Sequence, residues 1–403
     1  MKRNIIRPIV SLIFLGLASQ ANAGGLYLYE MGTEDVGLAN AGSAARAQDA
    51  SVVANNPAGM TRLEGDQVTF GLQALYGDVD YTLNNSNEKD AGNVIGWVPG
   101  GSAFYSHSLN DDLKFGLAMY SNFGLSLSFN DNWAGRNLIT DTTLASITLQ
   151  PTLGYRLNAQ WSLGAGVGIN YGMFKLERER LQINGGGKTK QDETDVVANV
   201  KLGVLFELSE KTRFGLTYTS KVDYNFNIDA SGTLPGPNAR PWSLPFELST
   251  NAPQQVMFSG VQVFNEKWSL LGEVGWQDWS TFSESDVTVN NFTQSSSLEL
   301  QDTWHGAIGT QYQLTADTRL NFGVAYDSSM YDDQDNTSLA IPVGASWRFG
   351  TGVQHQLNEH SSLGAAFEYL TSEDSSVPEP VALSGSYDDP KLYFISANYS
   401  YRF

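Results

Sequence analysis

The sequence has no cysteine among its 403 residues, so disulfide bonds, a thiolate nucleophile and a cysteine-held metal site are all excluded. Basic residues are scarce as well: 24 lysines and arginines stand against 43 aspartates and glutamates, which gives a formal net charge of −19. Nucleic acid is bound largely through Lys and Arg contacts to phosphates, and is therefore a poor partner for this chain.

Long apolar runs are also missing. The run Ile9–Ala18 near the N-terminus is about half as long as the roughly 20 residues that a membrane-crossing helix needs. It follows three basic residues and precedes Ala21-Asn22-Ala23, an arrangement typical of a secretory signal peptide rather than a short membrane anchor. We expect cleavage after Ala23, so that residues 1–23 are removed and the loss of three basic residues takes the net charge to −22. Without a spanning helix, an exported chain can cross a membrane only as a closed β-barrel.

Six short polar turns recur along the rest of the chain. Each consists of an apolar residue followed by three small or polar residues, and successive copies begin 48, 51, 56, 50 and 43 residues apart. Asn, Asp and Ser at these points favour tight turns, and each interval has room for two membrane-crossing strands and one longer loop. The turns lie at 109–112, 157–160, 208–211, 264–267, 314–317 and 357–360.

After each turn, large apolar residues alternate with small or polar ones. Leu113, Phe115, Leu117 and Met119, for example, alternate with smaller or polar neighbours, which predicts a strand with one face toward lipid and one toward a lumen. These segments run to about ten residues, whereas strands of a soluble β-sandwich average about 5–6. The last one ends on Phe403, and a terminal aromatic strand is typical of a barrel that closes on its C-terminus.

Six turns separate seven hairpins, which predicts an all-β fold: a 14-stranded antiparallel transmembrane β-barrel over residues 66–403, in a bacterial outer membrane. Trp161, Trp268, Trp276 and Trp279 near strand ends predict an interfacial girdle. The short turns should face the periplasm and the longer connections the outside. Those connections are expected near 82–98, 130–141, 182–193, 229–252, 284–297, 328–341 and 371–389.

Residues 24–65 do not alternate. They contain a small-residue run, Leu38–Ala45, and a helix-stopping Asn56-Pro57 step. Small residues allow close backbone packing, and a barrel of 14 strands leaves a lumen wide enough to hold a segment of this kind. We therefore predict a small helical N-terminal hatch, residues 24–65, inside the barrel.

Several segments, in order along the chain, resemble the outer-membrane long-chain fatty-acid transporter (FadL) family over essentially the whole mature length. The resemblance implies that the hatch plugs the barrel and takes part in ligand binding, and that a kink in the third strand opens a hole in the wall. It places Asn56, Pro57 and Ala58 in the hatch. The segments that carry it are Gly37–Gly42 with Asp49-Ala50, Asn56-Pro57-Ala58, Ser121-Asn122-Phe123-Gly124-Leu125, Asn130–Gly135 and Leu153–Asn158.

The function expected from this architecture is passive uptake of hydrophobic molecules, long-chain fatty acids or similar, with lateral release at the kink formed by Ser121 to Leu125. Phe123 and Leu125 would contact or gate the ligand. A mid-strand glycine such as Gly124 marks either a bend or a place where a neighbouring aromatic packs. A fatty-acid carboxylate needs a basic partner, for which the inward-facing Lys114 and Arg213 are candidates, although solvated lumen charge is the simpler explanation of both. The choice between fatty acid and an uncharged hydrocarbon or aromatic stays open.

Other functions are weighed against this one. Long outer loops suit a surface adhesin or receptor, and an unplugged lumen would suit a porin for polar solutes. A lipase would need a nucleophile and a base, and His107 between Ser106 and Ser108 is the only close grouping, without an evident orienting acid. The acidic run Asp332–Asp335 is more simply a solvated loop than a calcium site. We predict no catalysis, cofactor or metal, a monomer in contact with lipopolysaccharide, and assembly through Phe403 by the barrel-assembly machinery.

Overall fold

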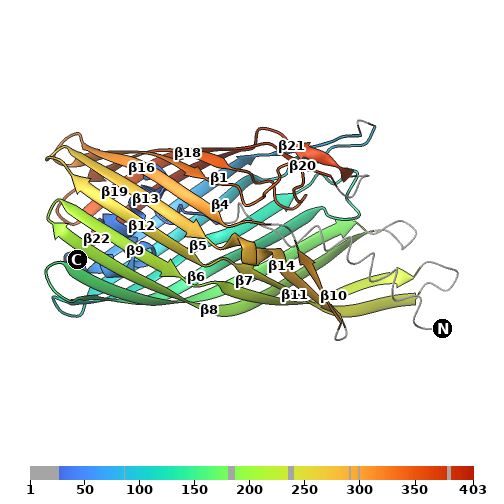
Figure 1. The fold of residues 1–403 in the computed structure, drawn as a ribbon, viewed down its shortest axis with the longest axis horizontal. Helices are drawn as coiled ribbons and strands as arrows, with labels where there is room; N and C mark the ends of the chain where they lie inside the picture. The colour runs from blue at the N-terminus through green and yellow to red at the C-terminus, as the bar shows by residue number, and fades with distance from the viewer. Residues whose placement is uncertain are drawn as a thin grey trace.

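The computed structural model describes residues 27–85, 87–179, 187–234, 240–289, 292–297, 300–378 and 383–403. These residues form a closed barrel of 14 antiparallel strands, as the turn repeat predicted (Figure 1). The predicted signal peptide, residues 1–23, lies outside the described residues. In the described part of the chain, no helix is both long and apolar enough to span a bilayer.

The barrel strands follow one another around the ring in chain order, and the last pairs with the first, Gln67 opposite Arg402. They are β1 (Gln67–Asp78), β4 (Gly96–Ser108), β5 (Leu113–Ser128), β6 (Asp141–Arg156), β7 (Trp161–Glu179), β8 (Lys188–Ser209), β9 (Thr212–Thr219), β12 (Gln255–Val263), β13 (Trp268–Gln277), β16 (Thr303–Gln313), β17 (Thr318–Asp327), β18 (Ser346–Gln356), β19 (Ser361–Ser372) and β22 (Lys391–Arg402).

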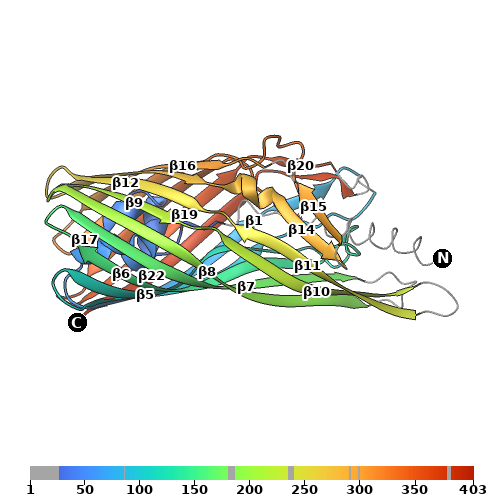
Figure 2. The same cartoon turned by 60° about the horizontal axis from the view of Figure 1, so that its bottom comes forward.

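The six predicted turns join these strands at one end of the barrel, where the C-terminus also lies (Figures 1 and 2). In five of the six turns the first polar residue closes the turn with its own side chain. Asn158 Oδ1, for example, accepts hydrogen bonds from the backbone N–H groups of Gln160 at 2.9 Å and Trp161 at 3.0 Å. Asn110, Ser209, Asn265 and Asn358 make the same pair of bonds in their turns. This side-chain capping is the reason that the motif repeats.

The alternating strand faces also lie as predicted. On β5, Leu117 and Met119 are exposed on the outside of the barrel, whereas Ala118 and Tyr120 are buried inside it. Trp161 and Trp268 are likewise exposed, as an interfacial girdle requires. Trp279 does not belong to that girdle: it lies in the short 3₁₀ helix η3 (Trp279–Ser283) and is buried in the core.

The segment before β1 folds inside the barrel as a small helical hatch, drawn in blue within the ring of strands (Figures 1 and 2). Its elements are α2 (Thr33–Leu38), α3 (Ser43–Arg46), α4 (Val52–Asn55) and the 3₁₀ helix η1 (Pro57–Arg62). The helices are short because the chain turns out of each one: Ala39 and Ala47, the residues that end α2 and α3, have positive φ angles of 46°.

Inward-facing glycines let the hatch touch the barrel wall. A Cβ at Gly215 on β9 would overlap the backbone oxygen of Ala44, and a Cβ at Gly323 on β17 would overlap that of Leu38. On β7, the same addition at Gly164 would run into Pro57 and Ala58. Many of the strand glycines in the sequence are therefore contact points for the hatch, where any side chain would push it away.

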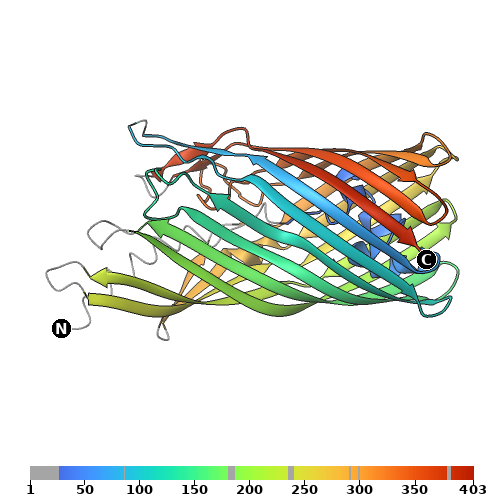
Figure 3. The same ribbon diagram turned by 180° about the vertical axis from the view of Figure 1, so that it is seen from behind.

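The end opposite the turns is more ordered than predicted. Two further sheets lie there, one of β10 (Val222–Leu234), β11 (Arg240–Ala252), β14 (Glu284–Val289) and β15 (Phe292–Ser297), the other of β20 (Ser375–Val377), β21 (Gly385–Tyr387), β2 (Asp80–Leu83) and β3 (Gly92–Asn93). The first extends well past the rim (Figure 3). The long connections predicted at 229–252 and 284–297 do join barrel strands, but they contain strands of the first sheet, and β8 begins at Lys188, inside the connection predicted at 182–193. Backbone pairing overrides turn-forming composition here.

Candidate functional site

The hatch is held to the wall by a buried carboxylate on β13. Glu273 accepts hydrogen bonds from Asn40 Nδ2 at 2.7 Å, from the backbone N–H of Ser43 at 2.6 Å and from its hydroxyl at 2.9 Å. Ser259 on β12 donates to the same carboxylate at 2.6 Å. One inward-facing acid thus satisfies donors from both the hatch and the neighbouring strand, which makes it a fixed attachment point.

The two basic residues singled out in the sequence also contact the hatch. Lys114 on β5 donates from Nζ to the backbone oxygen of Leu63 at 2.9 Å. Arg213 on β9 donates to the backbone oxygens of Ala45 and Arg46, both at 2.6 Å. Both side chains face the lumen, as the alternation predicted, and both cap carbonyl groups at the ends of hatch helices.

The Asn56-Pro57-Ala58 turn is a third attachment point. Asn56 Oδ1 accepts from the backbone N–H of Ala58 at 3.0 Å and so begins η1. Its Nδ2 donates to the backbone oxygen of Val204 on β8 at 3.0 Å and to that of Ala44 at 2.6 Å. One amide therefore shapes the turn and ties it to both the wall and α3.

An irregularity interrupts β5 near its middle. Its pairing with β6 shifts register between Tyr120 and Phe123, where three residues of β5 advance against two of β6. The upstream segment of the hatch, residues 27–32 before α2, meets the same place. Tyr27 forms a β-bridge with Phe123, and the backbone N–H of Leu28 donates to the oxygen of Asn122 at 2.8 Å. The upstream segment is therefore bonded directly to the bulge.

A gap in the hydrogen-bond ladder lies beside this bulge. The pairing of β4 with β5 ends at Ala103 opposite Met119, although both strands continue. Beyond that point β4 pairs with β1, and β5 pairs with β6 and with Tyr27 and Leu28 of the hatch, but β4 and β5 do not pair with each other; the next link is the N–H of Ser128 to the oxygen of Val94 at 2.7 Å. The unpaired stretch of β4 contains Pro99, which lacks an N–H and is tolerated in sheets at edges.

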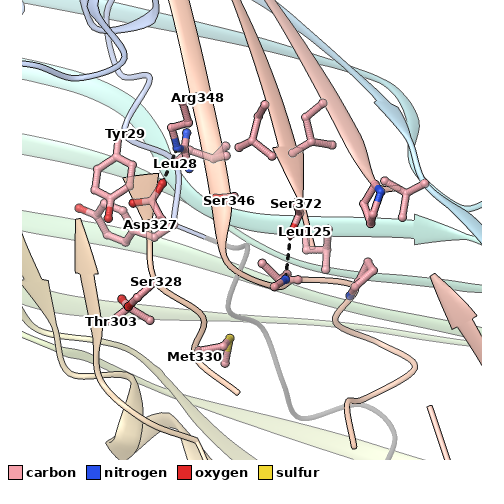
Figure 4. Close-up of a pocket in the computed structure, with 18 of the residues that line it drawn as sticks. Leu28, Tyr29, Leu125, Thr303, Asp327, Ser328, Met330, Ser346, Arg348 and Ser372 are labelled. Atoms are coloured by element: carbon pink, nitrogen blue, oxygen red, sulfur yellow. Dashed lines mark hydrogen bonds and ion pairs between the residues drawn. The ribbon is translucent and has the colours of Figure 1, made fainter. Parts of the chain in front are cut away.

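Two cavities meet behind the gap. The wall cavity lies against it, between Val98–Ser102 of β4 and four residues of β5: Ser121, Gly124, Leu125 and Ser126. The inner cavity lies deeper, where it reaches the upstream segment of the hatch and the ends of β17 and β18 (Figure 4). It comprises about 820 Å³ of space between atoms, the part open to solvent included. Both cavities share five apolar lining residues: Leu28, Ile95, Leu125, Leu392 and Phe394.

One buried charged cluster lies at the inner cavity. Arg348 on β18 donates from Nε to Asp327 at 2.7 Å and from Nη1 to Glu368 at 3.4 Å, and it also pairs with Glu30 of the segment leading into the hatch. Asp327 in turn lies 2.7 Å from Nδ1 of His305. Figure 4 shows Arg348 and Asp327 joined by a dashed line beside the ring of Tyr29. That ring stands over the guanidinium at 5.0 Å, a cation–π distance.

Comparison with known proteins places this architecture. Residues 14–403 match the family model described as outer membrane protein transport protein (OMPP1/FadL/TodX). The chain belongs to this family. The FadL-family barrel is 26% identical to the long-chain fatty acid transport protein of Escherichia coli (strain K12), with 96% of each chain covered, and 25% identical to outer membrane protein P1 of Haemophilus influenzae (strain ATCC 51907 / DSM 11121 / KW20 / Rd), with 90% of this chain and 89% of the relative covered.

Solved structures agree on the fold. A FadL homologue of Pseudomonas aeruginosa superposes with a TM-score of 0.80 at 19% identity, covering 94% of this chain and all of that one. The toluene transporter TodX of P. putida gives 0.71 at 16% identity, with 93% and 99% covered. With the family model that matches the chain, this fold makes the FadL-family barrel an outer-membrane transport protein.

The structure separates the residues that sequence reasoning singled out. Gly124 and Leu125 line the wall cavity, and Leu125 lines both cavities. Phe123 instead packs into the apolar core near the rim, stacked on Tyr224 with ring centroids 6.2 Å apart. Lys114 and Arg213 are absent from the lining of both cavities. A role of these residues in ligand binding stays a prediction.

Sequence reasoning missed two parts of the site. The run Pro99-Gly100-Gly101 inside β4 was a signal for a free strand edge. The buried Arg348 and Glu368 also carried a signal, because charged residues at inward positions of strands need partners. Their common partner Glu30 lies over 300 positions away along the chain, and only the fold could reveal it.

The histidine grouping weighed for a lipase has a partner that the sequence analysis did not find. Asp66 accepts from the backbone N–H of Ser108 at 2.9 Å and lies 2.7 Å from Nδ1 of His107. Ser106 is fully buried, whereas the side chain of His107 is 41% exposed, because neighbours on a strand point to opposite faces. The histidine and the Ser106 hydroxyl therefore do not meet as base and nucleophile.

Proposed function

We propose that the barrel carries hydrophobic molecules from the outside into the inner cavity, then through the wall cavity and sideways into the membrane through the gap between β4 and β5. The observation that carries this proposal is that the two cavities are adjacent, because they share five apolar lining side chains, and that the wall cavity lies against the gap. An apolar molecule loses free energy of transfer whenever it enters water, and this route keeps it in apolar contact.

The hatch fits the same proposal. It fills the lumen at the turn end, where glycines bring the wall against it and Glu273 fixes it. A path straight through would require the hatch to leave these contacts, whereas a sideways path leaves them in place. Movement of the upstream segment, bonded to the bulge at Asn122, would couple the occupancy of the inner cavity to the width of the gap.

A bulky side chain in the gap tests the route. A Cβ at Gly124 would lie 2.8 Å from that of Ala145, another lining residue of the wall cavity, so Gly124→Leu should fill this cavity. We expect uptake of a radiolabelled alkane or fatty acid by cells expressing the variant to fall by about tenfold or more. Gly306→Leu is the matched control, because Gly306 has open space around its Cβ position.

Heat-modifiable mobility on gels shows whether each variant is folded. Leu125→Trp, at the boundary of the two cavities, is a second obstruction in case Gly124→Leu does not assemble. Unchanged uptake by a folded obstructed variant would rule out the lateral route.

A further inference from the structure

We propose that the inner cavity selects uncharged hydrophobic molecules over carboxylate anions, and that the buried cluster around Arg348 sets this preference. The inference rests on the proposed function and narrows its substrate class. The cavity should bind hydrocarbons, aromatics, alcohols and esters more tightly than ionised fatty acids.

The lining of the cavities contains one cation. Among the described residues that line the inner cavity, the charged ones are Arg348 and Asp327, and the wall cavity has no charged lining residue at all. The other polar groups of the inner cavity include Ser346, Ser372 and Gln277, which suit a neutral oxygen. Of the described residues that line this cavity, Arg348 alone could therefore serve an entering anion as a cationic partner.

The positive charge of Arg348 is already surrounded by a larger number of negative charges. Arg348 contacts three carboxylates, from Glu30, Asp327 and Glu368. Glu30 and Glu368 each keep one buried oxygen without a hydrogen-bond donor. The cluster therefore lacks donors rather than acceptors, and a further carboxylate would add to the shortage.

The signs of the charges lead to the same conclusion. A ligand carboxylate close enough to bind the guanidinium would also lie close to the acids that surround it, and repulsion from them would offset the attraction. Even with His305 charged, or with one proton held between Glu30 and Glu368, the cluster carries no net positive charge. Apolar ligands meet no such opposition, because the rest of the lining is largely aliphatic and aromatic.

Glu30 offers a gain-of-function test. Glu30→Gln removes one negative charge from the cluster while it keeps the shape and an acceptor oxygen for Arg348. The double variant Glu30→Gln/Glu368→Gln leaves one cation facing Asp327 alone. Glu88→Gln, in an exposed loop, makes the same charge change away from the cavities and is the matched control.

The probes are radiolabelled decanoate and methyl decanoate, which differ in the charge of the head group. Binding to the purified, detergent-solubilised protein is measured by scintillation proximity at about pH 8, where the free acid is ionised. We expect the wild type to bind the ester about tenfold more tightly than the anion, relative to partition into detergent alone. Glu30→Gln should raise the affinity for decanoate by about tenfold and change that for the ester by less than about threefold, and the double variant should raise it further.

Three results would overturn the inference. The first is a wild type that binds decanoate as tightly as the ester. The second is a decanoate-to-ester ratio that stays the same in Glu30→Gln and in the double variant. The third is an equal change of this ratio in Glu88→Gln. Absence of binding for both probes in folded protein would instead contradict the proposed transport function itself, and the inference would fall with it.

Discussion

Charged side chains within the hatch are grouped closely. Arg46 pairs with Glu34 at 3.1 Å and with the fully buried Asp35. Asp49 lies at the edge of this group, half-buried, in a hollow at the turn end of the barrel. Burial raises the pKa of Asp49 to about 6, and the nearby Glu34 carboxylate adds to the rise, while hydrogen bonds from Ser51 and the charge of Arg46 oppose it.

The raised pKa of Asp49 makes the closed hatch sensitive to pH. Below about pH 4 Asp49 is protonated whether the hatch is closed or open; between about 4 and 6 it ionises first in the open form, which lowers the stability of the closed form as pH rises. We expect hydrogen-exchange protection factors of α3 and α4 to fall by roughly tenfold from pH 4 to 7. Asp49→Asn should remove the change, whereas Asp111→Asn, in an exposed turn, should keep it. A pH-independent wild type, or an unaltered dependence in Asp49→Asn, would contradict this expectation.

For individual residues, the direction of a side chain could be predicted from the sequence, but its hydrogen-bond partners could not. Alternation places Lys114 and Arg213 in the lumen because successive strand residues face opposite sides. Their hydrogen bonds to Leu63 and Ala45 depend on how far the hatch reaches into the barrel, which no local pattern records. For the same reason the sequence could not tell a ligand-binding base from one that holds the hatch.

Among the elements, the turns and strands were the most predictable. Asn158 and its counterparts make local hydrogen bonds, so residue type alone determines the turn. The outer sheets were missed because Pro and Gly were taken as loop signals, although Tyr224, Phe226 and Ile228 alternate along β10 and are buried. The gap between β4 and β5 depends on a missing partner, and the run Pro99-Gly100-Gly101 was the signal for it that the sequence analysis did not use.

The contact between β17 and α2 can be tested at Gly323. A methyl group there would overlap the backbone oxygen of Leu38, which cannot rotate away as a side chain could. We expect Gly323→Ala to weaken hatch closure by about 1–3 kcal/mol, the usual range for overpacking. Hydrogen exchange of α2 reports the loosening. Gly306→Ala, with open space around it on β16, should behave as wild type; equal protection of α2 in both variants would show that the contact is not tight.

Over the whole molecule, the packing of the hatch in the lumen should govern the passage of ions. We expect the wild type to give no large steady conductance in planar bilayers, and a variant lacking residues 27–62 to give a conductance about tenfold higher or more, because a barrel of this size leaves an aqueous lumen when empty. The barrel strands begin only at Gln67, so their pairing is preserved. A wild-type conductance equal to that of the deletion variant would favour a general porin.

For the whole molecule, fold class and membrane location could be predicted from the repeated polar turn and from the two-residue alternation along the strands. Every strand of a barrel obeys the same geometric rules. The domain limits, the lipopolysaccharide contact, the monomeric state and the role of Phe403 in assembly stay predictions. So does an adhesin role for the outer loops, although the sheets β10–β11 and β14–β15 give part of that surface a defined shape.

The unpaired stretch between β4 and β5 also has a mechanical consequence. A ring in which all neighbouring strands are fully hydrogen-bonded resists a change of circumference everywhere, whereas β4 and β5 lack these bonds over several consecutive residues, which makes a seam in this ring. Lateral pressure and a mismatch in bilayer thickness will concentrate their strain at this seam. The lipid that receives the cargo therefore helps to set how wide the exit stands, and the transport rate should change with acyl-chain length in proteoliposomes more steeply than that of a barrel with a complete ladder.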